Sequence, residues 1–269
     1  MSQKFVATET NALQCSPAVA FTAAPDPRRI DPVDNPRLQE AGCIAITHEK
    51  KYYEFLEDDK NQVFMKRNLT PSEYLVNRAG NLVIPKLPRE RMENEVAAIR
   101  YIQEHTTIPT PNIRCAFEDH GRYYIITDVV PGATLAQLSE EQKAVVIKEL
   151  DEYVAQLHSI TSSIMGGFSG RVCLPYRISE AIDHDDVLKF REAETPEFVL
   201  CHNDLSQHNV IVDEETLKVN AILDWEYAGF YPREFDSPFY YRPGPSAAIE
   251  DEKDDVPELL KVLDKWRVV

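Results

Sequence analysis

The chain has 269 residues, a net charge of −16 and 43% hydrophobic residues, which is enough apolar material for a sizeable core. Such acidity argues against a nucleic-acid partner, because phosphate binding requires clustered lysine and arginine. We find neither a membrane-length apolar stretch nor a secretory leader pattern, so we expect a cytoplasmic protein with no membrane partner. The five cysteines lack metal-site spacing, which suits a reducing compartment.

The N-terminal part of the chain predicts two different regions. Residues 1–35 are rich in proline and show little apolar periodicity, so we interpret them as an irregular leader. Residues 36–130 contain short β-favouring runs separated by turn-prone segments, and they predict an N-lobe built on a small antiparallel sheet. The expected strands cover residues 43–46, 62–66, 81–85, 112–117 and 122–130.

One helix is expected within this lobe, over residues 91–104. Val96, Ile99 and Ile102 fall at helical spacing among charged residues. The helix should end before Pro109, since the residue before a proline disfavours helical geometry.

The pattern H-x-D-x-x-x-x-N at residues 202–209 is typical of kinases, which hold the α- and β-phosphates of the nucleotide with a lysine and a glutamate of the N-lobe. Residues 36–130 are therefore the expected nucleotide-binding lobe. Lys86 ends an expected strand and Glu95 lies in the helix after it, so we prefer Lys86 with Glu95. Lys66 is the alternative, since a proline directly before Lys86 is unusual in a central strand. The chain has no G-x-G-x-x-G loop, and residues 67–72 are the candidate replacement, although an ordinary exposed turn is the favoured interpretation there.

Residues 131–269 predict a mainly helical C-lobe that carries the catalytic loop, the metal site and the acceptor site. Ser139 and Gln142 form a capping-box pattern at the start of a long helix. Val146, Leu150 and other apolar residues of this helix recur on one face, which indicates a helix packed on a core.

A loop with the pattern H-x-D-x-x-x-x-N is the most informative feature of the chain. It covers residues 202–209 between apolar runs at 198–201 and 210–212, and a third apolar run ends at Asp224. Kinases use this arrangement to position a hydroxyl group and magnesium ions. The alternative is a turn between core strands that its Asp and Asn merely cap.

Each polar residue of this motif has an expected role. Asp204 would orient and deprotonate the acceptor hydroxyl, whereas Asn209 and Asp224 would supply oxygen ligands to Mg²⁺. His202 is expected to brace the loop. Glu226 lies two residues beyond Asp224, on the same side if the chain is extended. It could support the metal ligands, contact a cationic acceptor or form a surface salt bridge.

The chain resembles the aminoglycoside phosphotransferase and choline kinase-like family across most of its length. Besides the loop at 202–209, the run D-W-E-Y-A-G at residues 224–229 is similar to the D-F/W-E-Y-A-G stretch of choline kinases. Residues 93–111 are similar to a looser pattern of fungal members. The resemblance implies an α+β, two-lobed protein-kinase-like fold. It also implies ATP as the phosphoryl donor and Mg²⁺ as the metal.

The resemblance further implies a hinge at residues 125–132, whose backbone would contact adenine. Asp128 C=O and Val130 N–H are the implied hydrogen-bond partners. The implied acceptor is a hydroxyl group of a small molecule, and the acidity of the chain weakly favours a cationic one. Neither the acceptor nor the oligomeric state follows from the sequence.

Three rival functions stay open at this point. The absent glycine loop and the short stretch after Asp224 also suit a nucleotide-binding scaffold that has lost transfer. A protein kinase is disfavoured because no A-P-E segment follows Asp224. A metal-dependent hydrolase that uses His202, Asp204 and Asp224 is the fourth interpretation.

Overall fold

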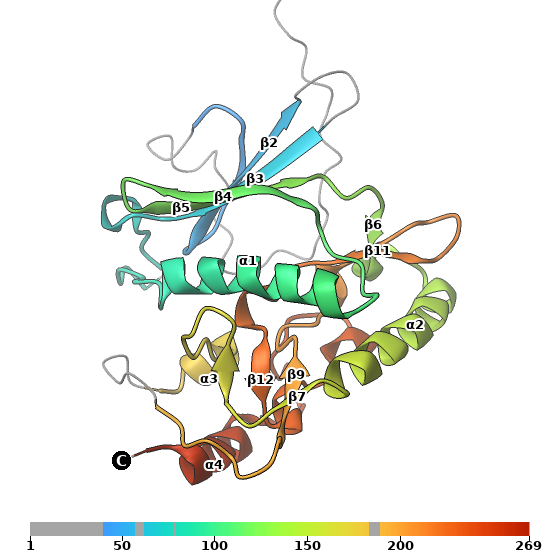
Figure 1. Ribbon diagram of the computed structural model, residues 1–269. Helices are drawn as coiled ribbons and strands as arrows, with labels where there is room; N and C mark the ends of the chain where they lie inside the picture. The colour runs from blue at the N-terminus through green and yellow to red at the C-terminus, as the bar shows by residue number, and fades with distance from the viewer. Residues whose placement is uncertain (1–39, 57–61, 78, 183–188, 269) are drawn as a thin grey trace, which may run out of the picture.

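An antiparallel sheet of five strands lies at one end of the molecule, and helices with small sheets lie at the other (Figure 1). The structure is a computed structural model that describes residues 40–56, 62–77, 79–182 and 189–268. The expected leader therefore lies outside the described residues. The expected α+β class is confirmed. Three strands, helix α1 (Pro88–His105), two further strands and then the C-terminal part follow one another along the chain, which is the order of a protein-kinase-like fold.

The five-stranded sheet has the order β1-β2-β3-β5-β4, and all neighbouring strands are antiparallel. Four of the strands match expected ones, with small differences at their ends, whereas β2 was not expected. The strands are β1 (Cys43–Ile46), β2 (Lys50–Leu56), β3 (Gln62–Asn68), β4 (Ile113–Asp119) and β5 (Arg122–Asp128).

The expected strand at residues 81–85 is wrong. That segment forms a single β-bridge between Val76 and Leu82 and no ladder. Pro85 lacks a backbone donor, and Leu87 adopts a left-handed conformation with φ of 46° just before helix α1 begins at Pro88. The chain therefore turns here, and Lys86 does not belong to the sheet.

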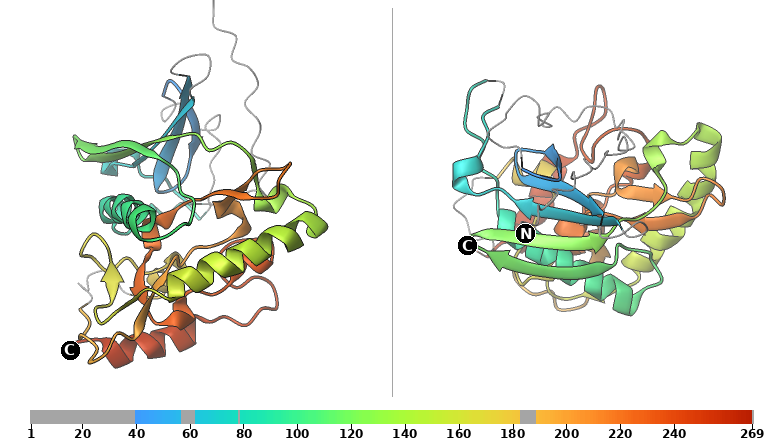
Figure 2. Two further views of the ribbon diagram at one scale, coloured as in Figure 1. Left: turned by 45° about the vertical axis from the view of Figure 1, so that its right-hand side comes forward. Right: turned by 90° about the horizontal axis from the view of Figure 1, so that it is seen from above.

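Helix α1 (Pro88–His105) lies between the sheet and the C-terminal part, as Figure 1 and the left view of Figure 2 show. It begins three residues before the expected start, because a proline is favourable in the first helical turn. Its buried face includes Met92, Val96, Ile99 and Ile102. These residues pack the helix against β5 on one side and against the 3-10 turn Trp225–Tyr227 on the other.

The C-terminal part contains three helices and two small sheets within the described ranges. The helices are α2 (Glu140–His158), α3 (Tyr176–Ser179) and α4 (Val256–Trp266). One sheet has the order β11-β10-β6 and the other β7-β9-β12-β8. The strands are β6 (Ala133–Thr134), β7 (Thr161–Ser162), β8 (Gly166–Gly167), β9 (Phe198–Cys201), β10 (Val210–Val212), β11 (Val219–Ile222) and β12 (Gly229–Tyr231).

Helix α2 begins where its capping box predicts. The Ser139 hydroxyl accepts a hydrogen bond from the Gln142 backbone N at 3.3 Å. Val146 and Leu150 are fully buried in the main core, together with Trp225. This core holds the strands on either side of the loop at residues 202–209, which we call the catalytic-type loop. Among the described residues, we find no helix that is both long and apolar enough to cross a membrane.

Candidate active site

The H-x-D-x-x-x-x-N segment connects β9 to β10, and the strand pairing brings it beside Asp224. Val210 of β10 pairs with Ile222 of β11. One residue further, the backbone N of Leu223 donates to the carbonyl oxygen of Asn209 at 2.8 Å. Asn209 and Asp224 are therefore neighbours, although they are 15 positions apart in the sequence.

Asp204 and Asp224 line the same pocket, whose walls come from both the five-stranded sheet and the C-terminal part. The β1–β2 turn and the start of β2 contribute residues from the sheet, and the segments around the two aspartates contribute residues from the C-terminal part. The lining residues are Thr47, His48, Glu49, Lys50, Tyr52, Tyr176, Asp204, Asp224, Glu226 and Tyr227. The structure thus brings together the residues expected to act as base and as metal ligand.

His202 is fully buried and holds the loop, as expected. Its Nε2 lies 2.9 Å from the carbonyl oxygen of Leu223, and its Nδ1 accepts from the backbone N of Asp204 at 3.2 Å. Burial lowers the pKa of His202, which favours a neutral ring that donates from Nε2 and accepts at Nδ1. The ring packs on Trp225, whose side chain is buried in the core as expected.

Lys66, and not Lys86, pairs with Glu95. The Nζ atom of Lys66 lies 2.6 Å from Glu95 Oε1 and 2.6 Å from Asp224 Oδ1. Lys86 donates instead to the backbone carbonyls of Ser179 and Ile182. The expected pairing of Lys86 with Glu95 is therefore wrong, because the segment before Lys86 is not a strand. The alternative, Lys66, belongs to β3 in the middle of the sheet.

Burial and neighbouring charges shift the pKa values of Lys66, Glu95 and Asp224 in opposite directions. Burial alone would lower the pKa of Lys66, but the carboxylates of Asp224 and Glu95 raise it well above its usual value. Burial raises the pKa of Glu95 to about 6, although Lys66 opposes the shift. Burial would also raise the pKa of Asp224, and Lys66 with Lys50 holds it below its usual range. At neutral pH, Lys66 is therefore a cation between two anions.

Glu226 does not lie on an extended chain. Asp224 has a left-handed backbone, with φ of 58°, and a 3-10 turn follows it. Glu226 is buried and contacts Lys50 Nζ at 2.6 Å and Arg91 Nη1 at 3.5 Å. The salt bridge foreseen as one alternative exists, but it is buried within the pocket and not on the surface.

The expected hinge lies at the end of β5. The carboxylate of Asp128 accepts hydrogen bonds from Asn112 Nδ2, at 2.6 Å, and from Arg114 Nε. The backbone N of Val129 donates to the carbonyl oxygen of Gln62 at 3.2 Å. Asp128 C=O and Val130 N–H thus lie where the sheet passes into the C-terminal part, and their contact with adenine stays a prediction.

Residues 67–72 do not line the pocket. Arg67 is buried and contacts Glu73 Oε1 at 2.7 Å and Glu40 Oε1 at 2.8 Å, so its charge is already paired. The β1–β2 turn lies over the pocket instead, with Thr47, His48 and Glu49. This turn was not expected from the sequence, because strand β2 was not expected: its K-K-Y-Y-E-F-L run mixes charged and aromatic residues.

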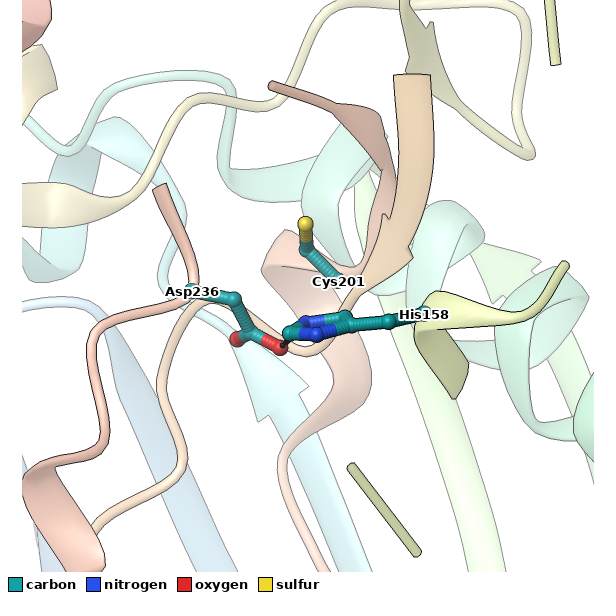
Figure 3. Close-up of side chains that lie close together, drawn as sticks. All are labelled: His158, Cys201 and Asp236. Carbon is teal, nitrogen blue, oxygen red and sulfur yellow. Dashed lines mark hydrogen bonds and ion pairs between the residues drawn. The ribbon is translucent and has the colours of Figure 1, made fainter. Parts of the chain in front are cut away.

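The buried side chains of His158, Cys201 and Asp236 lie close together near the loop at residues 202–209 (Figure 3). His158 Nε2, at the end of α2, lies 3.0 Å from Asp236 Oδ2. Asp236 Oδ1 accepts from the backbone N of Asn203 at 2.9 Å. Asn203 has φ of 68°, so this bond supports a left-handed residue directly before the expected base. Burial raises the pKa of the nearby Cys201 thiol well above its usual value, so it is a neutral thiol.

The model of a family described as "Phosphotransferase enzyme family" matches residues 55–237 of this chain, which is more than half of its length. The chain belongs to this family. Membership confirms the resemblance to aminoglycoside phosphotransferases that the catalytic-type motifs indicated. The match includes Lys66, Glu95, the loop at 202–209 and Asp224.

Two curated relatives of this phosphotransferase-family chain are aminoglycoside 3'-phosphotransferases. The protein from Streptomyces ribosidificus is 23% identical over 166 residues, which cover 53% of this chain and 62% of the relative. The protein from Streptomyces fradiae is 24% identical over 181 residues, which cover 57% and 66% of the two chains. The aligned part of this chain therefore spans about three fifths of the length of these relatives.

Solved structures of aminoglycoside phosphotransferases are also similar to this family member. One is APH(3'')-Id from Streptomyces rimosus in complex with ADP and streptomycin, with 14% identity, a TM-score of 0.49 and coverage of 88% of this chain and 91% of that one. Another is an aminoglycoside-3'-phosphotransferase of type VIII, with 16% identity, a TM-score of 0.47 and coverage of 87% and 96%.

Proposed function

We propose that this protein transfers the γ-phosphoryl group of ATP to a hydroxyl group of a small molecule in a Mg²⁺-dependent reaction. One observation carries the proposal. Lys66 joins Glu95 to Asp224, and Asp224 shares a pocket with Asp204. The residues proposed as phosphate-binding cation, metal ligand and base therefore lie close together, and this proximity supports the proposal because phosphoryl transfer requires all three.

Asp204 would accept the proton of the acceptor hydroxyl. Two hydrogen bonds hold its backbone in the loop: its backbone N donates to His202 Nδ1 at 3.2 Å, and its backbone O accepts from Asn209 Nδ2 at 2.7 Å. That second bond commits the amide nitrogen of Asn209 to the loop, which leaves the amide oxygen as the donor atom for a cation.

Asn209 and Asp224 would hold Mg²⁺, because amide and carboxylate oxygens suit this hard cation. When bound, the metal ion would neutralise developing charge on the phosphates. Lys66, supported by Glu95, would hold phosphate oxygens, while Asp128 C=O and Val130 N–H would bind adenine. These residues act through placement and charge, since the transition state of phosphoryl transfer is loose.

A cationic acceptor, such as an amino alcohol or an amino sugar, suits the charge of this protein. The pocket is lined by the carboxylates of Glu49, Asp204, Asp224 and Glu226, and the chain has a net charge of −16. The names of the curated relatives, aminoglycoside 3'-phosphotransferases, agree with this class.

A cytoplasmic location is part of the proposal. The four described cysteines are all free thiols, as a reducing compartment favours.

The direct test is a transfer screen with the full chain, ATP and Mg²⁺ over amino alcohols, amino sugars and neutral sugars. We expect acceptor-dependent formation of ADP, together with a product that is heavier by one phosphoryl group. ATP that stabilises the protein in a thermal-shift assay without any acceptor-dependent turnover would favour the nucleotide-binding scaffold instead. Phosphate release that needs no nucleotide would favour a hydrolase.

The buried pair behind the loop yields a separate prediction. Asp236→Asn replaces one acceptor oxygen by a donor amide, so the bond to Asn203 N or the contact with His158 is lost. We expect turnover to fall by about tenfold to a hundredfold because the base is misplaced, with little change in the affinity for ATP. Steady-state kinetics of Asp236→Asn and His158→Gln check this, and equal losses of ATP affinity and turnover would contradict a role in positioning.

A further inference from the structure

Lys50 is a second buried lysine of the pocket. It is the first residue of β2, directly after the β1–β2 turn, and its side chain is 4% exposed. Lys50 lines the same pocket as Asp204 and Asp224. Side chains alternate along a strand, so Lys50 and Tyr52 lie on one face of β2. Tyr52 is directly opposite Lys66 on β3, and the two lysines therefore face the same side of the sheet.

The charge balance of the pocket calls for a second cation when a triphosphate binds. Lys66 is already shared between Glu95 and Asp224, and the lining includes four carboxylates. Kinases with a glycine-rich loop cover the phosphates with backbone N–H groups, but this chain has no such loop. The β1–β2 turn that lines the pocket consists of Thr47, His48 and Glu49. It contains no glycine, and Lys50 follows it directly.

Glu226, which contacts Lys50, also contacts a second buried cation, Arg91. Glu226 Oε2 lies 2.6 Å from Lys50 Nζ, but Glu226 Oε1 also lies 3.5 Å from Arg91 Nη1. Arg91 is itself fixed, since its Nη2 lies 3.0 Å from Glu49 Oε1 and its Nη1 also contacts the Tyr227 hydroxyl. If Lys50 turns away, Glu226 keeps a buried cation, so movement of Lys50 does not leave an unpaired charge.

We propose that Lys50 is a second phosphate-binding lysine, which leaves Glu226 and contacts the triphosphate of bound Mg·ATP in place of a glycine-rich loop. This inference rests on the proposed function. A lysine suits the task because its charge stands on a flexible four-carbon stem, so the ammonium group can exchange one anion for another. Glu226 then acts as the resting partner of Lys50 while the site holds no nucleotide.

The test compares two ligands on the full chain by calorimetry with Mg²⁺ present: the non-hydrolysable ATP analogue AMP-PNP and adenosine. Lys50→Met should weaken AMP-PNP binding by about tenfold to a hundredfold, and it should leave adenosine binding within about twofold. Lys50→Arg should restore part of the affinity for AMP-PNP, because it keeps the charge. Glu226→Gln should not weaken AMP-PNP, since it releases Lys50.

Lys51→Met is the matched control. Lys51 is the next residue of β2 and is also buried, but its Nζ contacts Glu40 at 2.7 Å and Glu73 at 3.0 Å, outside the pocket. Lys51→Met should lower the melting temperature without changing the ratio of AMP-PNP affinity to adenosine affinity. A Lys50→Met protein that loses both ligands equally, or neither, overturns the inference while the proposed function stands. Failure of the wild-type protein to bind Mg·AMP-PNP overturns both.

Discussion

Asp204→Asn is expected to lower the rate of phosphoryl transfer by about 10²–10⁴-fold, because it removes the group that accepts the hydroxyl proton. The affinity for Mg·ATP should stay within about twofold, since the proposed nucleotide contacts come from other residues. The loop should keep its shape, because its bonds to His202 and Asn209 use the backbone of Asp204 and not its carboxylate. Single-turnover transfer and equilibrium binding of AMP-PNP measure the two quantities separately.

Asp224→Asn is the variant with which Asp204→Asn should be compared. Asp224 contacts Lys66 and is proposed to hold the metal ion, so its loss should weaken Mg·ATP binding as well as transfer. The protein should remain folded, as circular dichroism can verify. If both variants kept their turnover, or if Asp204→Asn lost nucleotide affinity as severely as Asp224→Asn, the assigned roles of the two aspartates would be wrong.

Lys66→Met is expected to lower turnover by about a hundredfold or more and to weaken ATP binding, since it removes a charge-assisted contact to phosphate. It also leaves the buried Glu95 without its partner. Burial raises the pKa of Glu95 to about 6 with Lys66 present, so without the lysine this carboxyl group should take up a proton more readily. Thermal stability should therefore fall less at pH 5.5 than at pH 8.

Lys86→Met is the matched control for that variant. Its ammonium group contacts the backbone carbonyls of Ser179 and Ile182 and neither Glu95 nor Asp224. Turnover and ATP affinity should therefore stay within about twofold of the wild-type values. Steady-state kinetics on both variants decide which lysine holds phosphate. A large loss in Lys86→Met with an active Lys66→Met would reverse the assignment.

The sequence predicts the catalytic-type loop well because the signals there are local. The strands at residues 198–201 and 210–212 occur with the expected bounds, and the polar loop lies between them. The pairing of β10 with β11 then places Asp224 beside Asn209. Apolar runs that alternate with a polar turn determine all of this, so no distant contact is needed to foresee it.

The sequence did not decide whether Lys66 or Lys86 pairs with Glu95. The partner of Glu95 has to lie on the central strand next to α1, and which strand is central depends on long-range strand pairing. Two prolines and a left-handed Leu87 remove the segment before Lys86 from the sheet. The pair of His158 and Asp236 shows the same limit, because its members are 78 positions apart in the sequence and neither has a local signal.

Manganese binding in the presence of AMP-PNP tests most directly whether this cleft holds a metal-bound triphosphate. Mn²⁺ substitutes for Mg²⁺ at oxygen-ligand sites, and its paramagnetic resonance signal distinguishes free from bound ions. We expect the wild-type protein with AMP-PNP to retain Mn²⁺ at a stoichiometric site and Asp224→Asn to lose it. Equal Mn²⁺ binding by both proteins, or none by the wild-type protein, would contradict the account.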